Sequence, residues 1–405
     1  MRKSYYSDRI KIVVLENGLI STYTAREALM NKLVSLNYEV YVLTHTNQYC
    51  KKVEEMGIKV INIGSANFNP LKIGSYIFRL WQNLQKINPD LCLTFSVRPT
   101  IWGNLISRIL GIPVITNITG TGPLFTSNSL AYRFIRTIYP LVLQKTETVF
   151  FQNSDDRDQF ISNGFVSASK CRLIPGSGVD HQKFSPIQTD DKDINHFTFL
   201  YIGRLLKDKG VPEFVEAAKK VRAKHSQVKF KIIGPVWKQN SRANMISQNT
   251  VNSWVSNGIV EYEGEKNDVR EDIALADCIV LPSHREGTSN VLLEASSMER
   301  PCIATDVPGC REIVEDGVTG FLCKLKDHDD LAIKMENLLS LKNDDIVKMG
   351  IAARHKVMRE FDKQIVINHY LEAIDASLNR HAAEVYIFPR HSAIPSAQSA
   401  TSKAV

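Results

Sequence analysis

The chain has 405 residues, of which 43% are hydrophobic and 23% are charged. This composition is ordinary for a soluble globular protein and too apolar for a disordered chain, and the length predicts two or three domains. No stretch approaches the roughly 20 consecutive apolar residues that a membrane-spanning helix needs, and residues 1–9 lack the apolar core of a secretory signal. The seven cysteines form no Cys-x-x-Cys pair, so we expect reduced packing residues in a cytoplasmic protein.

The charge is distributed unevenly along the chain. Residues 1–185 carry 21 Lys and Arg against 12 Asp and Glu, whereas residues 186–405 carry 29 against 31. A basic first half suggests an anionic partner, such as a membrane surface or a phosphate-bearing lipid; the alternative is uneven solvation charge. No nucleic-acid recognition motif occurs, so we expect no nucleic-acid partner.

Apolar, β-rich runs alternate with helical patterns along the first half. Strands are predicted at 10–15, 39–44, 59–63, 90–95, 113–116 and 148–152, and helices at 25–36, 71–87, 101–110 and 130–144. Strands that alternate with helices indicate parallel βαβ units and a doubly wound sheet.

The alternation breaks at 174–180 and then restarts. Strands are predicted at 198–202, 229–233, 259–262, 278–281 and 301–305, and helices at 211–224, 269–275, 291–298 and 332–339. We therefore predict two α/β domains, residues 1–185 and 186–363, then a closing helix at 364–380 and a disordered tail at 381–405. Ligands of such sheets bind beyond the carboxyl ends of the strands, so the cleft between the domains is the expected site.

A doubly wound sheet often binds a nicotinamide cofactor, but the glycine pattern of this chain argues against such a cofactor. The fingerprint Gly-x-Gly-x-x-Gly needs three glycines, but Gly120-Thr121-Gly122 and Gly176-Ser177-Gly178 supply two each. A Walker A sequence is absent as well. A dinucleotide dehydrogenase or a P-loop enzyme is therefore improbable.

The strongest signal is the loop Pro282-Ser283-His284-Arg285-Glu286-Gly287-Thr288-Ser289-Asn290, which follows a predicted strand and opens a predicted helix. The amides of Gly287, Thr288, Ser289 and Asn290 would point outward at the helix N-terminus, which favours an anion such as a phosphate. Glu286 and Glu294 would lie about 12 Å apart were the span helical. That is the reach from the sugar to the ribose of a nucleotide-sugar, although any two glutamates on a solvated helix can share this spacing.

A second signal follows the strand at 198–202. Gly203 permits close backbone approach, and Arg204 and Lys209 then supply two cations in a turn. Arg204 offers a planar fork for phosphate oxygens, whereas Lys209 is a mobile point charge. An isolated Arg and Lys would indicate only a solvated turn, but this turn and the glutamate loop both follow strands of one predicted sheet.

Together these residues resemble the retaining glycosyltransferases of family 4, whose GT-B fold places two Rossmann-like, doubly wound domains across a central cleft. The resemblance covers about residues 10–380. Its specific core is Gly-Arg-Leu…Lys-Gly at 203–210 and Glu-x7-Glu at 286–294, flanked by a matching stretch at 301–309 and by Glu312, Gly317 and Gly320. Residues 95–103 and 117–122 resemble, more loosely, the subgroup that builds capsule, O-antigen and protein-linked glycans on polyprenyl diphosphate carriers.

The resemblance implies a role for each matched residue. Arg204 and Lys209 would hold the donor diphosphate and Glu286 would contact the donor sugar, so these three are the expected catalytic residues. Glu294 would bind the ribose, and residues 263–265 would border the nucleobase. The expected donor-binding residues are Gly203, Gly287, Thr288, Ser289, Asn290, Val291, Glu294, Gly264 and Glu265.

No metal or other cofactor is expected, because fixed cations and helix amides can neutralise a leaving phosphate. The pattern Asp-x-Asp occurs at 156–158, 191–193 and 327–329, and three chance matches show how weak it is. Residues 154–156 read better as a helix cap with acidic first-turn residues.

The first half departs from the family pattern at two places. Residues 116–119 stand where many members carry His-Asp, and Glu16-Asn17-Gly18 stands where paired glycines are common. Acceptor contacts are therefore expected from Asn117, Thr119, Gly120, Arg98 and Ser21. Residues 71–81 and 132–136 mix aromatic and basic side chains at helical spacing, which suits either an anionic membrane leaflet or simple packing on the sheet.

The sequence therefore predicts a metal-independent, retaining glycosyltransferase. It would move a hexose or N-acetylhexosamine from a nucleotide-sugar, which the resemblance implies to be a UDP-sugar, to a polyprenyl-diphosphate-linked glycan at the cytoplasmic face of the membrane. Two alternatives stay open, namely a non-hydrolysing nucleotide-sugar epimerase of the same fold and an inert nucleotide-sugar-binding protein. The donor sugar, the linkage and the oligomeric state are not predicted.

Overall fold

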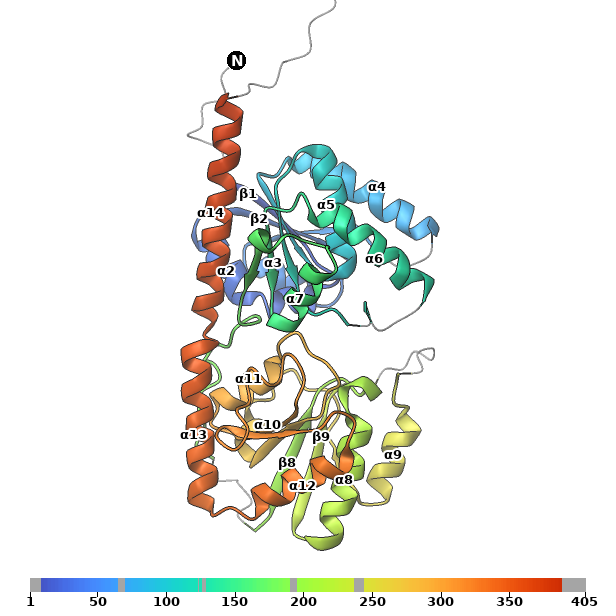
Figure 1. Ribbon diagram of the computed structural model, residues 1–405, viewed down its shortest axis with the longest axis vertical. Coiled ribbons are helices and arrows are strands. Elements are labelled where there is room, and N and C mark those ends of the chain that lie inside the picture. The colour runs from blue at the N-terminus through green and yellow to red at the C-terminus, as the bar shows by residue number, and fades with distance from the viewer. Residues whose placement is uncertain are drawn as a thin grey trace, which may run out of the picture.

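The computed structural model describes residues 9–64, 70–122, 124–125, 129–189, 195–236 and 244–387. Two parallel sheets, each covered by helices, lie end to end along the long axis of the molecule (Figure 1). The first sheet has the strand order β3-β2-β1-β4-β5-β6-β7. Its strands are β1 (Lys11–Leu15), β2 (Glu39–Thr44), β3 (Lys59–Asn62), β4 (Leu91–Phe95), β5 (Val114–Ile118), β6 (Thr148–Phe151) and β7 (Cys171–Leu173).

Alternate residues of the first sheet feed two separate cores. Ile12 and Val14 of β1 pack on the face that carries one group of helices, and Val13 and Leu15 pack on the opposite face, as the two-residue period of a strand requires. Because both faces of the sheet are buried at its centre, β1 and β4 are mostly apolar. The helices are α1 (Leu19–Tyr23), α2 (Glu27–Ser35), α3 (Cys50–Glu55), α4 (Pro70–Ile87), α5 (Val97–Leu110), α6 (Leu130–Leu143) and α7 (Ser154–Ser162).

The second sheet has the order β10-β9-β8-β11-β12-β13. Its strands are β8 (Phe197–Ile202), β9 (Val228–Ile233), β10 (Glu261–Tyr262), β11 (Cys278–Leu281), β12 (Cys302–Thr305) and β13 (Gly320–Cys323). The chain reverses direction across the sheet between β8 and β11, and such a switch point is where α/β sheets bind ligands. The helices are α8 (Val211–Lys224), α9 (Gln248–Ser256), α10 (Arg270–Leu275), α11 (Asn290–Ser297), α12 (His328–Leu339) and α13 (Asn343–Glu360).

The prediction of two doubly wound α/β domains is confirmed. The segments that sequence reading missed are short or lack a clear apolar period: β7, β13, α1, α3, α9 and the long helix α13. In α9, for example, the sequence Gln-Asn-Thr-Val-Asn-Ser-Trp-Val-Ser offers few apolar positions, so its periodicity is weak.

The last helix, α14 (Lys363–Ile387), runs back from the second sheet along the side of the first (Figure 1). Its apolar residues, among them Val366 and Ile374, join the core beneath β1 and β4. It was predicted to end at 380, with a disordered tail from 381; this was wrong for residues 381–387, which are helical. That stretch holds two alanines and a glutamate and no proline before Pro389, so nothing in it stops the helix. Residues 388–405 lie outside the described part of the chain.

Candidate functional site

The two predicted catalytic loops meet at the carboxyl edge of the second sheet. Lys209 closes a short 3₁₀ turn after β8, and Glu286 follows β11, the neighbouring strand. The Nζ atom of Lys209 lies 2.7 Å from Oε1 of Glu286, and the side chains are only 17% and 16% exposed. Arg204, in the same turn, is exposed, and no ion pair of the described residues includes it.

Glycines allow these loops to approach one another. A Cβ atom at Gly234 would lie 1.8 Å from the carbonyl oxygen of Gly203, and one at Gly210 would lie 1.9 Å from that of Pro282. Both distances are far inside van der Waals contact, so only glycine fits. Gly210 also has a φ of +72°, a conformation that other residues rarely adopt.

The loop 286–291 leads into helix α11, whose N-cap is Ser289. The Oγ atom of Ser289 accepts a hydrogen bond from the amide of Leu292, whereas the amides of Asn290 and Val291 donate to no group in the described ranges. Free amides at a helix N-terminus attract an anion. One predicted phosphate donor is corrected: the amide of Ser289 donates to the carbonyl of Gly309, at 3.1 Å, and is therefore already occupied.

The turn that follows β12 packs against the 286–291 loop. The carbonyl of Pro308 accepts a hydrogen bond from the amide of Glu286 at 3.3 Å, and the amide of Gly309 donates to Glu312 at 2.7 Å. A Cβ atom at Gly309 would lie 2.6 Å from the carbonyl oxygen of Gly287. The flanking motif at 301–312 therefore holds the 286–291 loop in position.

Glu294, one turn into α11, borders a pocket of about 390 Å³ between the two domains. Burial raises the pKa of its carboxyl to about 7, an effect that Lys183 opposes and Asp268 reinforces. The pocket is within the size range of small-ligand sites. Its lining includes Tyr23, Ala25, Asp268, Val269, Asn290 and Glu294.

Gly264 and Glu265, predicted to bind the donor, lie at the end of β10 on the same edge of the sheet. The carbonyl of Gly264 accepts a hydrogen bond from the amide of Gly234 at 2.7 Å, and Glu265 is exposed. The structure thus brings all the predicted second-domain residues to one edge, at the ends of β8, β10 and β11.

On the first-domain side, the loop after β5 lies directly against the 286–291 loop. A Cβ atom at Gly287 would lie only 2.2 Å from the carbonyl oxygen of Thr119, and one at Gly120 would lie 3.5 Å from the Cα of Gly287. Thr119 and Gly120 therefore pack against the loop that follows β11. Ser21 in α1 and Arg98 in the first turn of α5 are partly buried beyond the ends of β1 and β4.

Asn117 has a different role from the predicted acceptor contact. It is 2% exposed, and its Nδ2 atom donates to the hydroxyl of Tyr370 in α14 at 2.6 Å. A side chain this deeply buried cannot reach a glycan in the cleft. Asn117 instead fastens the closing helix to β5.

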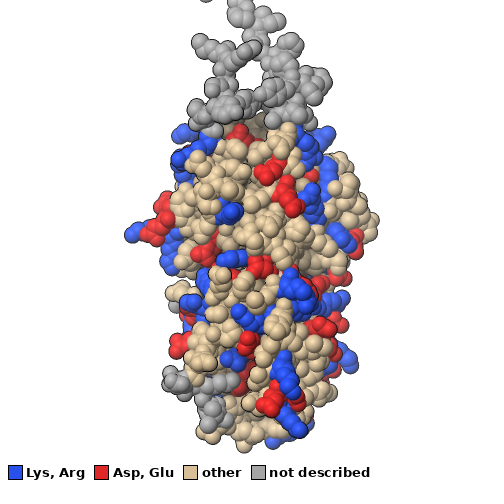
Figure 2. All heavy atoms as spheres, turned by 90° about the vertical axis from the view of Figure 1, so that its left-hand side faces the viewer, with Lys and Arg blue, Asp and Glu red and all other residues tan. Residues whose placement is uncertain are grey.

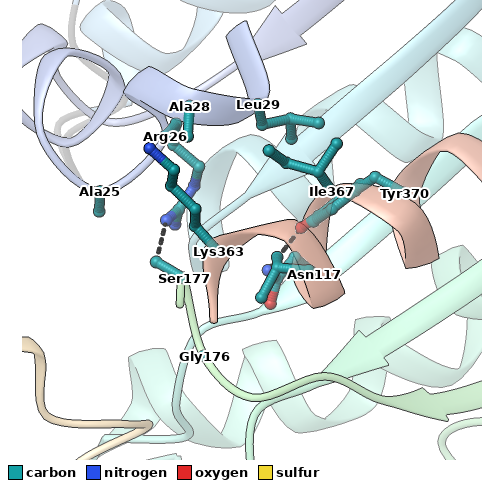
Figure 3. A pocket seen from close by; sticks show the side chains of 11 residues that line it. Ala25, Arg26, Ala28, Leu29, Asn117, Gly176, Ser177, Lys363, Ile367 and Tyr370 are labelled. Carbon is teal, nitrogen blue, oxygen red and sulfur yellow. Dashed lines mark hydrogen bonds between the residues drawn. The ribbon is translucent and has the colours of Figure 1, made fainter. Parts of the chain in front are cut away.

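Figure 3 shows the small cavity beside Asn117 and Arg26. The Nε atom of Arg26 lies 3.5 Å from Oε2 of Glu16, its Nη1 atom donates to Ser177 at 2.9 Å, and its guanidinium lies 4.4 Å from the ring centre of Phe95. Glu16, which stands where the family has paired glycines, is thus buried in an ion pair. Sequence reasoning missed this cluster, because Arg26 and Ser177 are 151 residues apart.

Sequence reasoning also missed several contacts that join the domains. The side-chain amide of Asn153 donates to the carbonyl of Gly287 at 2.9 Å, and the hydroxyl of Thr288 donates to the carbonyl of Gln152 at 3.1 Å. Arg285 forms an ion pair with Asp156, which is almost fully buried. The N-cap of α7 is Asn153, one residue before the position that the sequence indicated.

Two parallel sheets with a pocket between their domains, and with free helix amides beside a Lys–Glu pair on the second, are the arrangement of the GT-B fold. Solved structures agree on the fold. A glycosyltransferase from Rickettsia africae ESF-5 superposes with a TM-score of 0.75 at 20% identity, covering 92% of this chain and 99% of its own. Anabaena HepE, in complex with UDP and glucose, has a TM-score of 0.76 at 17% identity, covering 91% and 100%.

Family models match both halves of the chain. Residues 11–153 match the model described as "Glycosyl transferase 4-like", and residues 196–341 match "Glycosyl transferases group 1". The chain therefore belongs to the family-4-like glycosyltransferases that these two models describe.

Two curated relatives are named for transfer to lipid-linked sugars. The N,N'-diacetylbacillosaminyl-diphospho-undecaprenol alpha-1,3-N-acetylgalactosaminyltransferase of Campylobacter jejuni is 25% identical over 384 residues, which is 90% of this chain and 98% of the relative. The UDP-Gal:alpha-D-GlcNAc-diphosphoundecaprenol alpha-1,3-galactosyltransferase of Escherichia coli is 26% identical over 312 residues, which is 73% and 78%.

Proposed function

We propose that this glycosyltransferase moves a hexose or N-acetylhexosamine from a UDP-sugar to a polyprenyl-diphosphate-linked glycan, with retention of the anomeric configuration and without a metal ion. The observation that carries the proposal is the Lys209–Glu286 pair, 2.7 Å apart, beside the free amides at the start of α11. The loop that carries Glu286 also packs against Thr119 and Gly120 of the first domain.

The charges of this edge match the chemistry of glycosyl transfer. As the bond between sugar and phosphate breaks, negative charge develops on the leaving diphosphate. Lys209, Arg204 and the amides of Asn290 and Val291 would stabilise that charge, and preorganised groups of this kind supply a large part of an enzyme's rate enhancement. Glu286 would accept hydrogen bonds from the sugar hydroxyls while it holds Lys209 in place. Retention rests on the resemblance to family 4.

The relatives support a uridine nucleotide and a lipid-linked acceptor. The E. coli relative is named for UDP-Gal and an undecaprenol-linked acceptor, and the fold neighbour from Anabaena is in complex with UDP and glucose. In this chain the pocket beside Glu294 would hold the nucleoside, with its carboxylate on the ribose.

A surface for the lipid end of the acceptor is formed by α4, α5 and α6, which we call the basic helical face. These three helices contain seven Lys and Arg and no Asp or Glu, and α5 contacts both of its neighbours. They lie together on the side of the first domain away from α14 (Figure 1). The exposed large apolar side chains of this face are Phe78, Trp81, Leu105, Ile109, Leu130, Phe134 and Leu141.

The opposite side of the molecule differs in charge pattern. There, on the side that carries α14, acidic and basic side chains alternate (Figure 2). Cations mixed with exposed aromatic and aliphatic residues suit the headgroup layer of an anionic membrane. None of the described helices is both long and apolar enough to span a bilayer. We therefore propose peripheral contact with the cytoplasmic leaflet through the basic helical face.

The loop of Thr119 and Gly120 continues into this face. Ten residues after Gly120, which lies against Gly287, α6 begins at Leu130, which is 81% exposed. A glycan in the cleft could thus remain attached to a lipid in the adjacent membrane. This continuity supports a lipid-linked acceptor over a free sugar.

The proposal is tested by the release of nucleoside diphosphate from a panel of UDP-, GDP- and ADP-sugars in EDTA, with and without extracted polyprenyl diphosphate glycans. We expect release that depends on acceptor, that persists in EDTA and that is lost in Glu286→Ala. Conversion of a UDP-sugar without acceptor would instead indicate an epimerase. UDP binding without any turnover would indicate an inert binding protein.

A further inference from the structure

Arg285 reaches from the loop that follows β11 in the second domain, the donor loop, to a buried carboxylate of the first. Its Nη2 atom contacts Oδ1 of Asp156, whose side chain is only 1% exposed, whereas that of Arg285 is 28% exposed. Asp156 lies in the first turn of α7, where its own amide donates to Asn153 at 2.8 Å. Its Oδ2 atom accepts a hydrogen bond from the side-chain amide of Asn153 at 3.3 Å, so the carboxylate is held by its own domain while it contacts the other.

The same carboxylate contacts the loop on the acceptor side. The hydroxyl of Thr121, two residues after Thr119, donates to Oδ1 of Asp156 at 3.3 Å. Arg285 immediately precedes Glu286, the residue proposed to hold the donor sugar. Asp156 therefore links the loop of Thr119–Gly122 with the loop of Arg285–Thr288 through a single oxygen atom.

Further contacts surround this ion pair, among them one from the Nη2 atom of Arg285 to the side-chain oxygen of Gln159 at 3.5 Å. Asn153, the N-cap of α7, donates to the carbonyl of Gly287 at 2.9 Å, and Thr288 donates to the carbonyl of Gln152 at 3.1 Å. All of these bonds join the end of β6 and helix α7 to one loop of the second domain. None of them involves Arg204, Lys209 or the amides of Asn290 and Val291, which are the groups proposed to hold the diphosphate.

We propose that Asp156 and Arg285 are positioning residues, which dock the donor loop onto the first domain and so set Glu286 opposite the acceptor. The pair would act through the geometry of that loop and not on the reacting atoms. Because the diphosphate contacts belong to the second domain alone, UDP should bind whether or not the loop is docked. Turnover, in contrast, should require the docked arrangement. The kinetic part of this inference rests on the proposed function.

The test compares Asp156→Asn, Arg285→Gln and the double variant with wild type. The matched controls are Asp158→Asn and Arg157→Gln, which remove a partly exposed pair on the same helix, with an N–O distance of 2.7 Å. Three quantities are measured: the radius of gyration by small-angle X-ray scattering, the Kd for UDP by calorimetry, and kcat with donor and acceptor.

We expect each single variant to be more open, with a larger radius of gyration than wild type and the controls. Its Kd for UDP should stay within about threefold, while kcat falls by about 100-fold, the effect of a small misplacement of reacting groups. The double variant should be no slower than the single ones, because the two residues act as one unit. An unchanged radius of gyration and kcat, or single effects that multiply in the double variant, would overturn the proposal.

A second variant keeps the test decisive if removal of the buried pair prevents folding. Gly287→Ala adds one methyl group, which would meet the carbonyl of Thr119 at 2.2 Å and the side chain of Gln152 at 2.7 Å, both in the first domain. This methyl group should disfavour docking and leave the second domain intact. Gly74→Ala, whose methyl group would meet no atom within 4 Å, is the control.

The scattering measurement also separates this inference from the proposed function. If wild type shows no glycosyl transfer, the radius of gyration of Asp156→Asn and Gly287→Ala still reports docking. If wild type is active and these variants remain as compact and as fast as it, the docking role is wrong while the transferase assignment stands.

Discussion

The Nζ atom of Lys209 lies 2.7 Å from Oε1 of Glu286, although 77 residues separate them in the chain. They meet because β8 and β11 are neighbours in the sheet and glycines let the following loops approach. Each side chain is mostly shielded from water, which strengthens the interaction of such charges with a substrate. The pair places a cation and a hydrogen-bond acceptor close enough together to contact the diphosphate and the sugar of one donor molecule.

Replacement of Lys209 by methionine should abolish most turnover. The variant keeps the length of the side chain and removes the charge that would stabilise the leaving diphosphate. We expect kcat to fall by about 10²–10³-fold, the usual effect of losing one such group. Steady-state kinetics at saturating donor measures it.

The matched control for that prediction is Lys207→Met, in the same turn. Lys207 is exposed, and no ion pair of the described residues includes it, so its replacement should change kcat by less than about threefold. Equal losses for the two variants would mean that general positive charge, and not the position of Lys209, drives the reaction.

Donor binding should weaken below neutral pH because of Glu294. Burial raises the pKa of this carboxyl to about 7, so acidification through that value protonates it and weakens its acceptance of hydrogen bonds from the ribose. We expect the KM for the donor to rise as the pH falls from 8 to 6. In Glu294→Gln the KM should be higher at pH 8 and nearly constant over this range; a wild-type profile in that variant would exclude Glu294 as the cause.

The carboxyl of Glu294 should also affect the stability of the fold, but here low pH is favourable. A carboxyl whose pKa is higher in the folded chain than its ordinary 4.5 stabilises the fold fully below pH 4.5, and this contribution is lost as the pH rises to about 7. Glu294→Gln has no such loss. Its Tm relative to wild type should therefore increase between pH 4.5 and 7 and level off above, as differential scanning calorimetry can measure; a constant difference would contradict it.

Binding to anionic vesicles should depend on the basic helical face. Phe134 in α6 is 57% exposed beside Arg133, and Phe134→Glu would remove an apolar anchor and add a repulsive charge. We expect the partition coefficient to fall by about tenfold in vesicle co-sedimentation. Val347→Glu, at a 51% exposed site on α13, should leave binding unchanged. Similar losses in both variants would show that net charge alone is responsible.

Replacing only one member of the buried Glu16–Arg26 pair should lower the stability of the fold. Their side chains are 3% and 9% exposed, so Arg26→Met leaves an unpaired buried carboxylate. We expect it to lower the free energy of unfolding by about 3–5 kcal/mol, measured by urea denaturation. The double variant Glu16→Gln, Arg26→Met should be less destabilised than Arg26→Met alone; additive losses would mean that the two residues do not act as a pair.

The sequence predicted the fold well because its signals are local. The alternation of strands and helices is visible in every βα unit, and helix α8 begins and ends at the predicted residues Val211 and Lys224. The donor side was equally accessible, since Gly203, Arg204, Lys209 and the 286–294 segment are short motifs that follow strands. Parallel neighbouring strands then bring such motifs to one edge of the sheet.

The remaining features depend on contacts between distant segments. Asn117 was expected in the cleft, but Tyr370, 253 residues away, buries it. Asp156 was interpreted as an ordinary helix-start residue, whereas its partner Arg285 lies in the other domain. Residues 381–387 were predicted to be disordered because the chain from residue 381 onward is rich in Ala and Ser. No local pattern reports the first two pairings, whereas residues 381–387 were misread from the composition of the longer tail.

The most direct test of the transferase assignment is the mass of the acceptor. A purified polyprenyl-diphosphate-linked sugar, incubated with the UDP-sugar that supports UDP release, should gain the mass of one sugar residue in EDTA with wild type and not with Glu286→Ala. Release of free sugar with an unchanged acceptor mass would contradict transfer to a lipid-linked glycan.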